Sequence, residues 1–197
     1  MEPGTGLHPR AAPASAQRAY FPDIDDSWSS IWYPSRKGED VDDCHDRCRG
    51  FLSYLIPELE RRFGDKHKRI LLVSHAATII GLARELVGDR TLPMRVGCCT
   101  ICEFTPHPGS SRALGTWQAK RLGDGSFLKN GVEKEWGFED IELVNGKVSA
   151  ISTLHVRLVY RQLLILSQVI SHPGQPGTEN DPDEPVGLQL QETASRM

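Results

Sequence analysis

The sequence has no apolar run long enough to cross a membrane and no excess of positive charge. None of its 197 residues falls in a continuous apolar window of about 18 residues, the least that a membrane-spanning helix requires. The segment Met1-Glu2-Pro3-Gly4 does not lead into the apolar stretch of a secretory signal peptide. We therefore expect an intracellular protein, in the nucleus or the cytoplasm, with no membrane partner.

Charge and length set further limits. The 23 Lys and Arg residues against 26 Asp and Glu residues give a net charge of −3, which provides no global basic field for nucleic acid. We expect no direct binding to DNA. A hydrophobic content of 39% in 197 residues suits one modest domain with tails.

The number of cysteines is odd. Five cysteines in clusters argue against a disulfide framework. A zinc set of Cys44, Cys48, Cys99 and Cys102 is the alternative. The segment Val96–Thr105 reads as a strand, however, and residues three apart on a strand point to opposite faces. Cys44 and Cys48 share a helical face and are better explained as small buried thiols. We predict neither a metal nor a cofactor.

The most informative segment joins a predicted strand to a predicted helix. Ile70–Val73 are four consecutive apolar residues of strand-favouring types, which indicates a strand buried on both faces. A helical pattern follows at Ile79–Val87, and Gly88 is its stop signal. His75 therefore lies in the turn where an α/β fold places its chemistry.

Two interpretations of His75 are open on the residues alone. The side chain could simply bond to nearby backbone. Alternatively, Ser74, His75 and Ala76 could form a phosphate site, because the free N–H groups and positive dipole end of a helix favour an anion. A histidine there can donate to a phosphoryl oxygen.

A second amphipathic helix is predicted after Gly38-Glu39-Asp40. Its apolar stripe recurs at spacings of three and four residues: Val41, Cys44, Cys48, Phe51, Leu55 and Leu59. Pro57 inside the pattern predicts a kink or a break. His45 is expected on the solvated surface of this helix.

Further strands are predicted at Thr116–Leu122 and in a hairpin of Phe138–Leu143 and Lys147–Ile151 around Asn145-Gly146. The expected organisation has four parts: coil at 1–19, a domain at 20–153, an amphipathic helix at 154–171 and a disordered tail at 172–197.

The sequence around His75 resembles a motif of a known family. Leu71-Leu72-Val73-Ser74-His75-Ala76-Ala77-Thr78-Ile79-Ile80 is similar to the second histidine motif of the histidine phosphatase (phosphoglycerate mutase-like) superfamily. The resemblance implies an α/β fold, the three-layer sandwich of phosphoglycerate mutase. It also implies that His75 stabilises the phosphoryl group in flight and is not the nucleophile.

Other segments resemble one fungal branch of that superfamily, associated with the RNA polymerase III transcription factor tau (TFIIIC). These segments are Tyr20–Asp25, Tyr33–Glu39, His45-Asp46-Arg47, Leu122–Leu128, Glu133 and Trp136-Gly137-Phe138. The likeness implies a protein partner such as a subunit of a transcription complex.

The chain departs from the family pattern at its most important motif. The family's nucleophile is a histidine in an Arg-His-Gly turn, and none of the seven histidines here lies in one. The family's first strand is not found in residues 1–19 either, so we expect an incomplete sandwich. Ile70–Val73 would then keep an unpaired edge, which predicts marginal stability or a need for a partner chain.

These observations favour a catalytically incomplete domain that acts as a protein-interaction scaffold and binds phosphate or a phosphate monoester weakly. The alternative is a phosphate monoester hydrolase with a phosphohistidine intermediate, if a segment with the nucleophile exists in the native product. A metal-binding regulatory module is the third hypothesis.

Overall fold

The structure, a computed structural model, describes residues 12–110, 112–144, 147–150 and 187–188. The chain divides into two compact units, residues 1–39 with 173–197, and residues 40–172. The predicted helix at 154–171 and most of the predicted tail lie outside the described residues. The domain boundaries predicted from the sequence therefore stay a prediction.

The first unit contains three short elements. Helix α1 (Ala14–Gln17) is a single turn within the stretch predicted as coil. Strand β1 (Trp32–Tyr33) pairs antiparallel with β6 (Gly187–Leu188), and Trp32 stands opposite Leu188. The composition of the tail did not predict strand β6. Its pairing with β1 joins residues more than 150 positions apart in the chain, which local sequence does not reveal.

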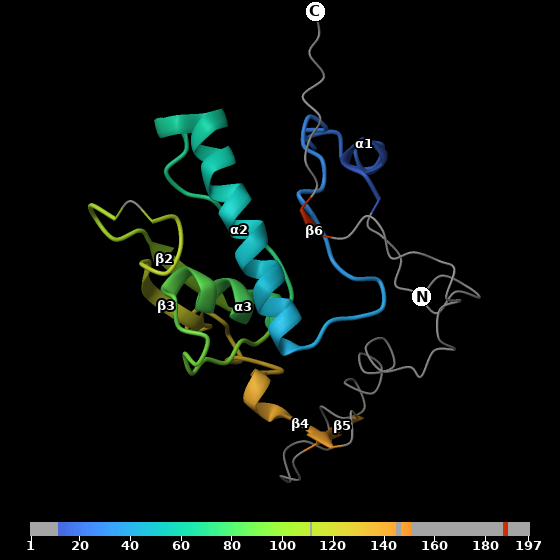
Figure 1. Ribbon diagram of the computed structural model, residues 1–197, viewed down its shortest axis with the longest axis vertical. Coiled ribbons are helices and arrows are strands. Elements are labelled where there is room, and N and C mark those ends of the chain that lie inside the picture. The colour runs from blue at the N-terminus through green and yellow to red at the C-terminus, as the bar shows by residue number, and fades with distance from the viewer. Residues whose placement is uncertain (1–11, 111, 145–146, 151–186, 189–197) are drawn as a thin grey trace, which may run out of the picture. The chain divides into compact units, whose positions relative to one another are not determined.

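The second unit is built around helix α3 (Ala76–Val87). Its helices are α2 (Val41–Phe63), η1 (Gly64–Lys66), α3 (Ala76–Val87) and η2 (Phe138–Asp140), and its strands are β2 (Ile101–Thr105), β3 (Gln118–Asp124), β4 (Ile141–Val144) and β5 (Lys147–Ala150). Helix α3 packs against α2 on one side and toward the β2–β3 pair on the other (Figure 1). All six residues from Ile80 to Glu85 are consequently buried.

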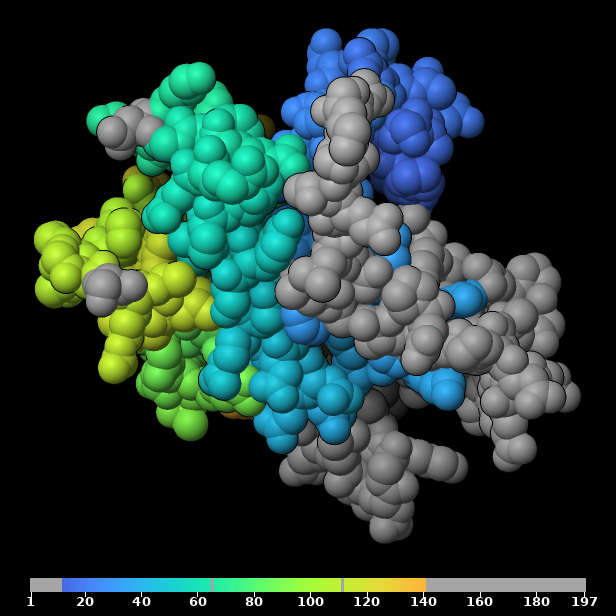
Figure 2. All heavy atoms as spheres, turned by 45° about the horizontal axis from the view of Figure 1, so that its top comes forward, coloured from blue at the N-terminus to red at the C-terminus, as the bar shows by residue number. Residues whose placement is uncertain are grey.

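Two apolar clusters hold these layers together. The cluster between α2 and α3 has buried Cys44, Cys48, Leu52 and Leu82 at its centre. Figure 2 shows the outer surface of this contact, where the blue-green atoms of α2 lie beside green atoms of the chain. The second cluster lies on the opposite side of α3 and is formed by Ile80, Ala83, Met94 and Val96.

Helix α2 begins with a capping box. The Asp40 carboxylate accepts a hydrogen bond from the Asp43 N–H, and the Asp43 carboxylate accepts one from the Asp40 N–H. The predicted stripe is confirmed, with Cys44, Cys48 and Leu55 buried. The prediction of a break at Pro57 is wrong. The helix continues to Phe63 because burial on both sides of Pro57 outweighs one missing N–H donor.

Helix α3 ends where the sequence predicts. Gly88 has φ +85° and its N–H donates to the Arg84 carbonyl at 2.8 Å. A side chain at Gly88 would be strained by this backbone conformation, and its Cβ would lie 2.7 Å from Gly115 Cα. The C-terminal end of α3 therefore depends on glycine at this position.

The predicted strand Val96–Thr105 is only partly correct. Val96 makes an isolated bridge with Trp136, and a turn follows before β2 begins at Ile101. Cys99 lies in this turn with φ +60°, so it is not a strand residue. Beyond the turn, β2 and β3 form an antiparallel pair with irregular register at Glu103. The predicted hairpin is confirmed as β4 and β5, although Phe138 belongs to η2.

The largest difference from prediction concerns Ile70–Val73. These residues form no strand and are exposed. A strand exists only when a neighbouring strand accepts and donates its backbone hydrogen bonds, and no described residue pairs with this segment. The prediction of a strand buried on both faces is therefore wrong, because no described residue supplies a partner strand.

Candidate phosphate site at the start of helix α3

His75 is the residue from which α3 starts. It occupies the N-cap position with extended backbone (φ −94°, ψ 160°), and its carbonyl accepts the first helical hydrogen bond from the Ile79 N–H at 2.9 Å. Its side chain does not cap the helix and is exposed. Within the described residues the imidazole makes no hydrogen bond to backbone, in contrast to the first interpretation drawn from the sequence.

The first turn of α3 carries an uncompensated positive field. It contains no acidic residue. The N–H groups of Ala76, Ala77 and Thr78 have no acceptor within the helix, as in any first turn. Ser74 and His75 are both exposed immediately before these groups. This geometry suits an anion with several oxygens, such as a phosphate.

Arg47 of α2 reaches the same turn. Its Nη2 lies 3.4 Å from the Thr78 hydroxyl and 3.5 Å from the Cys44 sulfur. The Cys44 and Cys48 thiols donate weakly to the Ala77 and Thr78 carbonyls, at 3.9 and 3.7 Å. Helix α2 therefore fixes the start of α3 and adds a guanidinium beside it.

Arg47 was not predicted as a site residue, although its place in the sequence carries a signal. Arg47 stands three residues after Cys44 and one before Cys48, so it borders the buried stripe of α2. Only the packing of α2 against α3 shows that Arg47 lies beside the first turn of α3.

His45 contradicts its predicted place on the solvated helix surface. It is buried, and its Nδ1 lies 2.8 Å from the Val41 carbonyl. Its ring contacts Phe138 with centroids 5.4 Å apart. The prediction was wrong because the described chain folds Phe138 of η2 back over this face of α2. Its Nε2 is buried and has no hydrogen-bond partner among the residues that the structure describes.

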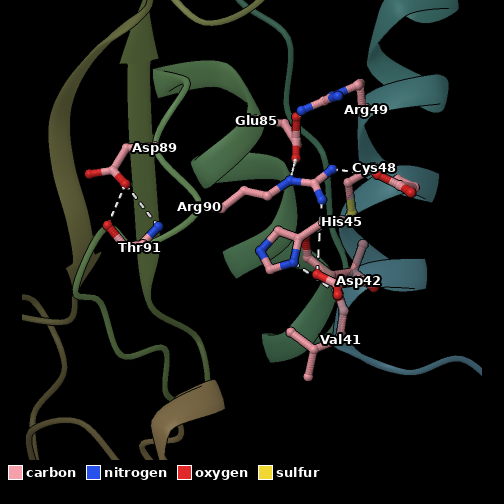
Figure 3. A network of polar contacts seen from close by, with 11 residues as sticks. Val41, Asp42, His45, Cys48, Arg49, Glu85, Asp89, Arg90 and Thr91 are labelled. Atoms are coloured by element: carbon pink, nitrogen blue, oxygen red, sulfur yellow. Dashed lines mark hydrogen bonds and ion pairs between the residues drawn. The ribbon is translucent and has the colours of Figure 1, made fainter.

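A buried carboxylate holds the other end of the α2–α3 contact. Glu85 accepts from Arg49 at 2.8 Å and from Arg90 at 2.7 Å (Figure 3). Arg90 also bonds to Asp46, and this hydrogen bond holds the pKa of the Asp46 carboxyl below its usual range. These groups are paired with one another, so we regard them as structural.

The thiols divide into two environments. Cys44 and Cys48 are buried as predicted, whereas Cys98 and Cys99 are exposed. Burial raises the pKa of the Cys102 thiol, which accepts from the Gly123 N–H. Among the residues that the structure describes, no three His, Cys, Asp or Glu side chains gather in a way that could hold a metal ion. No helix in that part of the chain has the length and apolarity needed to cross a membrane.

Comparisons with known proteins identify a matching family model and a similar curated protein. A family model described as histidine phosphatase superfamily (branch 1) matches residues 8–124. The transcription factor tau 55 kDa subunit of Saccharomyces cerevisiae (strain ATCC 204508 / S288c) is 27% identical over 149 residues, a match that covers 61% of this chain. It covers 33% of the yeast protein, so the chain spans about a third of the length of this curated relative.

Proposed function

Since the chain belongs to branch 1 of the histidine phosphatase superfamily, we propose that its 197 residues form a histidine-phosphatase-like domain that acts as a protein-interaction scaffold. The yeast relative is named as a subunit of a transcription factor. We extend that setting to this chain, which would place it in the nucleus with a transcription-complex subunit as its partner. The observation that carries the scaffold role is the exposed apolar run Ile70–Val73.

The chemistry available in these residues supports the non-catalytic part of the proposal. A covalent phosphoryl transfer needs a nucleophile held in line with phosphorus by a rigid turn. None of the seven histidines lies in an Arg-His-Gly turn. His75, at the start of α3, can donate a hydrogen bond to a phosphoryl oxygen, and Arg47 can offset its charge. Together they bind phosphate weakly without turning over an ester.

A turnover assay tests this part. The 197-residue chain and His75→Ala are compared with p-nitrophenyl phosphate as substrate, across a range of concentrations. We expect no saturating hydrolysis from either protein. Saturating turnover that His75→Ala abolishes would contradict the non-catalytic reading.

Purification of the tagged native protein from nuclei tests the scaffold part. We expect subunits of a transcription factor to copurify, and His75→Ala to retain them because phosphate binding is not the source of assembly. A native protein that copurifies with no such subunit would contradict the proposed setting.

The start of α3 also supports a second candidate, a phosphate monoester hydrolase. His75 and the first-turn N–H groups form the phosphate-stabilising half of such a site. The other half would need a nucleophile outside the residues given. Mapping the 5′ end of the native transcript tests this candidate. An upstream reading frame with an apolar strand that ends in Arg-His-Gly would favour the hydrolase, and translation from Met1 would disfavour it.

A further inference from the structure

The five cysteines of the chain differ in exposure, and the two exposed ones are neighbours. Cys98 and Cys99 are exposed, Cys102 is half-buried, and Cys44 and Cys48 are buried. Access from solvent is one of the properties that decide which thiols a soluble oxidant reaches. The chain therefore presents two adjacent thiols to solvent and keeps its other three less accessible.

The exposed pair occupies the centre of a tight turn. The Gly97 carbonyl accepts hydrogen bonds from the Thr100 N–H at 3.4 Å and from the Thr100 hydroxyl at 2.9 Å. The two cysteines are thus the central residues of a β-turn. Cys99 has φ +60°, a left-handed conformation that turns usually reserve for glycine or asparagine. Residues with side chains in this conformation concentrate at functional sites.

A neighbouring segment of the chain anchors this turn. The Cys98 N–H donates to the Glu133 carbonyl at 2.8 Å. Just before the turn, Val96 and Trp136 exchange two backbone hydrogen bonds, at 2.9 and 3.1 Å. These bonds fix the backbone on one side of the bend, so the two thiols are held together at an exposed position.

Cys102, three residues further on, lies in a different environment. It packs against the second apolar cluster, and its sulfur accepts a hydrogen bond from the Gly123 N–H at 3.2 Å. Burial raises the pKa of the Cys102 thiol, which lowers its thiolate fraction at neutral pH. Cys102 therefore provides an internal comparison for the exposed pair.

We propose that Cys98 and Cys99 form a modification site, a vicinal dithiol that a peroxide oxidises reversibly to a disulfide between the two neighbouring residues. One thiolate attacks a peroxide oxygen and becomes a sulfenic acid, and the other oxygen leaves as water. The second thiolate then attacks that sulfur and expels hydroxide, which takes up a proton. Two thiols and one hydrogen peroxide thus give one disulfide and two waters. The site goes beyond the proposed scaffold function and does not depend on it.

The short span between neighbouring residues makes such a bond easy to reduce. Adjacent Cα atoms lie about 3.8 Å apart, whereas most disulfides span roughly 4.4–6.8 Å between Cα atoms. Closing the ring between Cys98 and Cys99 therefore introduces strain, and strained disulfides are opened readily by a thiol such as glutathione. We expect a reversible mark rather than a permanent cross-link.

Thiol labelling of the 197-residue chain and of the native protein provides the test. Each protein is treated with a small excess of hydrogen peroxide and then unfolded in the presence of N-ethylmaleimide. Mass spectrometry follows the tryptic peptide Val96–Arg112, which contains three cysteines. The peptide should carry a label on each cysteine before oxidation and only on Cys102 after it. Dithiothreitol, added before the label, should restore full labelling.

Substitutions separate the paired reaction from oxidation of single thiols. Cys98→Ser and Cys99→Ser each leave one exposed thiol without its neighbour, so a sulfenic acid should persist and react with dimedone. The unsubstituted chain should give no dimedone adduct, because the second thiol resolves the sulfenic acid. Cys99→Gly, which suits the left-handed backbone, repeats the test in a variant that keeps the turn. The matched control Cys102→Ser should behave like the unsubstituted chain.

Several results would overturn the inference. These are a disulfide that includes Cys102, a disulfide between two chains, a dimedone adduct on the unsubstituted chain, or no oxidation at a peroxide concentration that oxidises the unfolded chain. A disulfide that forms in the 197-residue chain but not in the native protein would show that the two thiols are covered there, and the inference would fail.

Discussion

At the scale of single residues, two histidines of this chain lie in opposite environments. His45 lies among charged helix residues and was predicted on the solvated surface, yet it is buried against Phe138. His75 was predicted in the turn before a helix, and it lies exposed at the start of α3. Local sequence does not reveal which loop returns to cover a side chain, and this decides the burial of His45.

The contrast gives a prediction for His75→Ala. The variant should change the free energy of unfolding by less than about 0.5 kcal/mol, because an exposed side chain with no capping role contributes little. Phosphate should shift the amide resonances of Ala76 and Ala77 in the native protein and less in the variant. Urea denaturation and NMR titration measure the two effects.

His45→Ala is the matched control. It should lose about 1–3 kcal/mol of stability, because it removes a buried ring and the bond to the Val41 carbonyl. A loss of that size from His75→Ala would contradict the exposed site, and its absence from His45→Ala would contradict the buried ring.

At the scale of elements, α2 and α3 approach closely at one glycine. A Cβ at Gly81 would lie 2.8 Å from the Cys48 sulfur and 3.6 Å from the Cys44 sulfur. Gly81→Ala should therefore destabilise the protein by about 1–3 kcal/mol through overpacking, despite the higher helix propensity of alanine. Thermal or urea unfolding measures the loss.

A double mutant separates overpacking from other causes. Cys48→Ala removes the sulfur that the new methyl group would meet, so the loss in Gly81→Ala/Cys48→Ala should be smaller than the sum of the two single losses. Strict additivity would show that the methyl group and the sulfur do not compete for space.

The C-terminal part of α2 carries a pH-dependent ion cluster. Hydrogen bonds from Arg61, and then Arg62, lower the pKa of Glu58 from 4.5 to about 2. A carboxyl with a depressed folded-state pKa stabilises the fold above its unfolded pKa, and this stabilisation is lost as the pH falls toward 2. Glu58→Gln should be less stable than the native protein at pH 6, and the difference should shrink between pH 4.5 and 2.

Urea denaturation of both proteins at several pH values measures that difference. Glu60→Gln, a neutralisation on the same helix at an exposed position, is the control and should show a smaller pH-dependent difference. A Glu58→Gln difference that stays constant down to pH 2 would contradict the lowered pKa.

Sequence periodicity predicted helices better than strands here, for a physical reason. The stop at Gly88 and the stripe of α2 depend on residues within a few positions, because helical hydrogen bonds are local. The turn at Cys99 and the failure of Ile70–Val73 to form a strand depend on partners far along the chain. The β4–β5 hairpin was predictable because its two strands are adjacent.

The candidate site follows the same division. Ser74, His75 and Ala76 follow from the order of one apolar run and one helix, and their phosphate role stays a prediction. Arg47 could not be added from the sequence, because its place depends on how α2 crosses α3. The family itself was identified from sequence motifs in separate segments of the chain. The match of the family model over residues 8–124 confirms it.

At the scale of the whole molecule, the described core is small for the apolar content of the chain. The largest side chains that are wholly buried are Ile80, Val96 and Cys48, none of them aromatic. The four aliphatic residues Ile70–Val73 are exposed to solvent and do not add to this core. Because stability rises with buried apolar area, we expect the isolated chain to be marginally stable.

Leu71→Thr/Val73→Thr distinguishes an open apolar edge from a hidden core. Both side chains are already in solvent, so the variant should change the free energy of unfolding by less than about 0.5 kcal/mol while dye binding to exposed apolar surface and aggregation both fall. Ile80→Thr, at a wholly buried position, is the control and should cost about 2–4 kcal/mol. A loss above about 1 kcal/mol in the double variant would mean that the run is covered in solution, and the scaffold role would then lose the surface on which it depends.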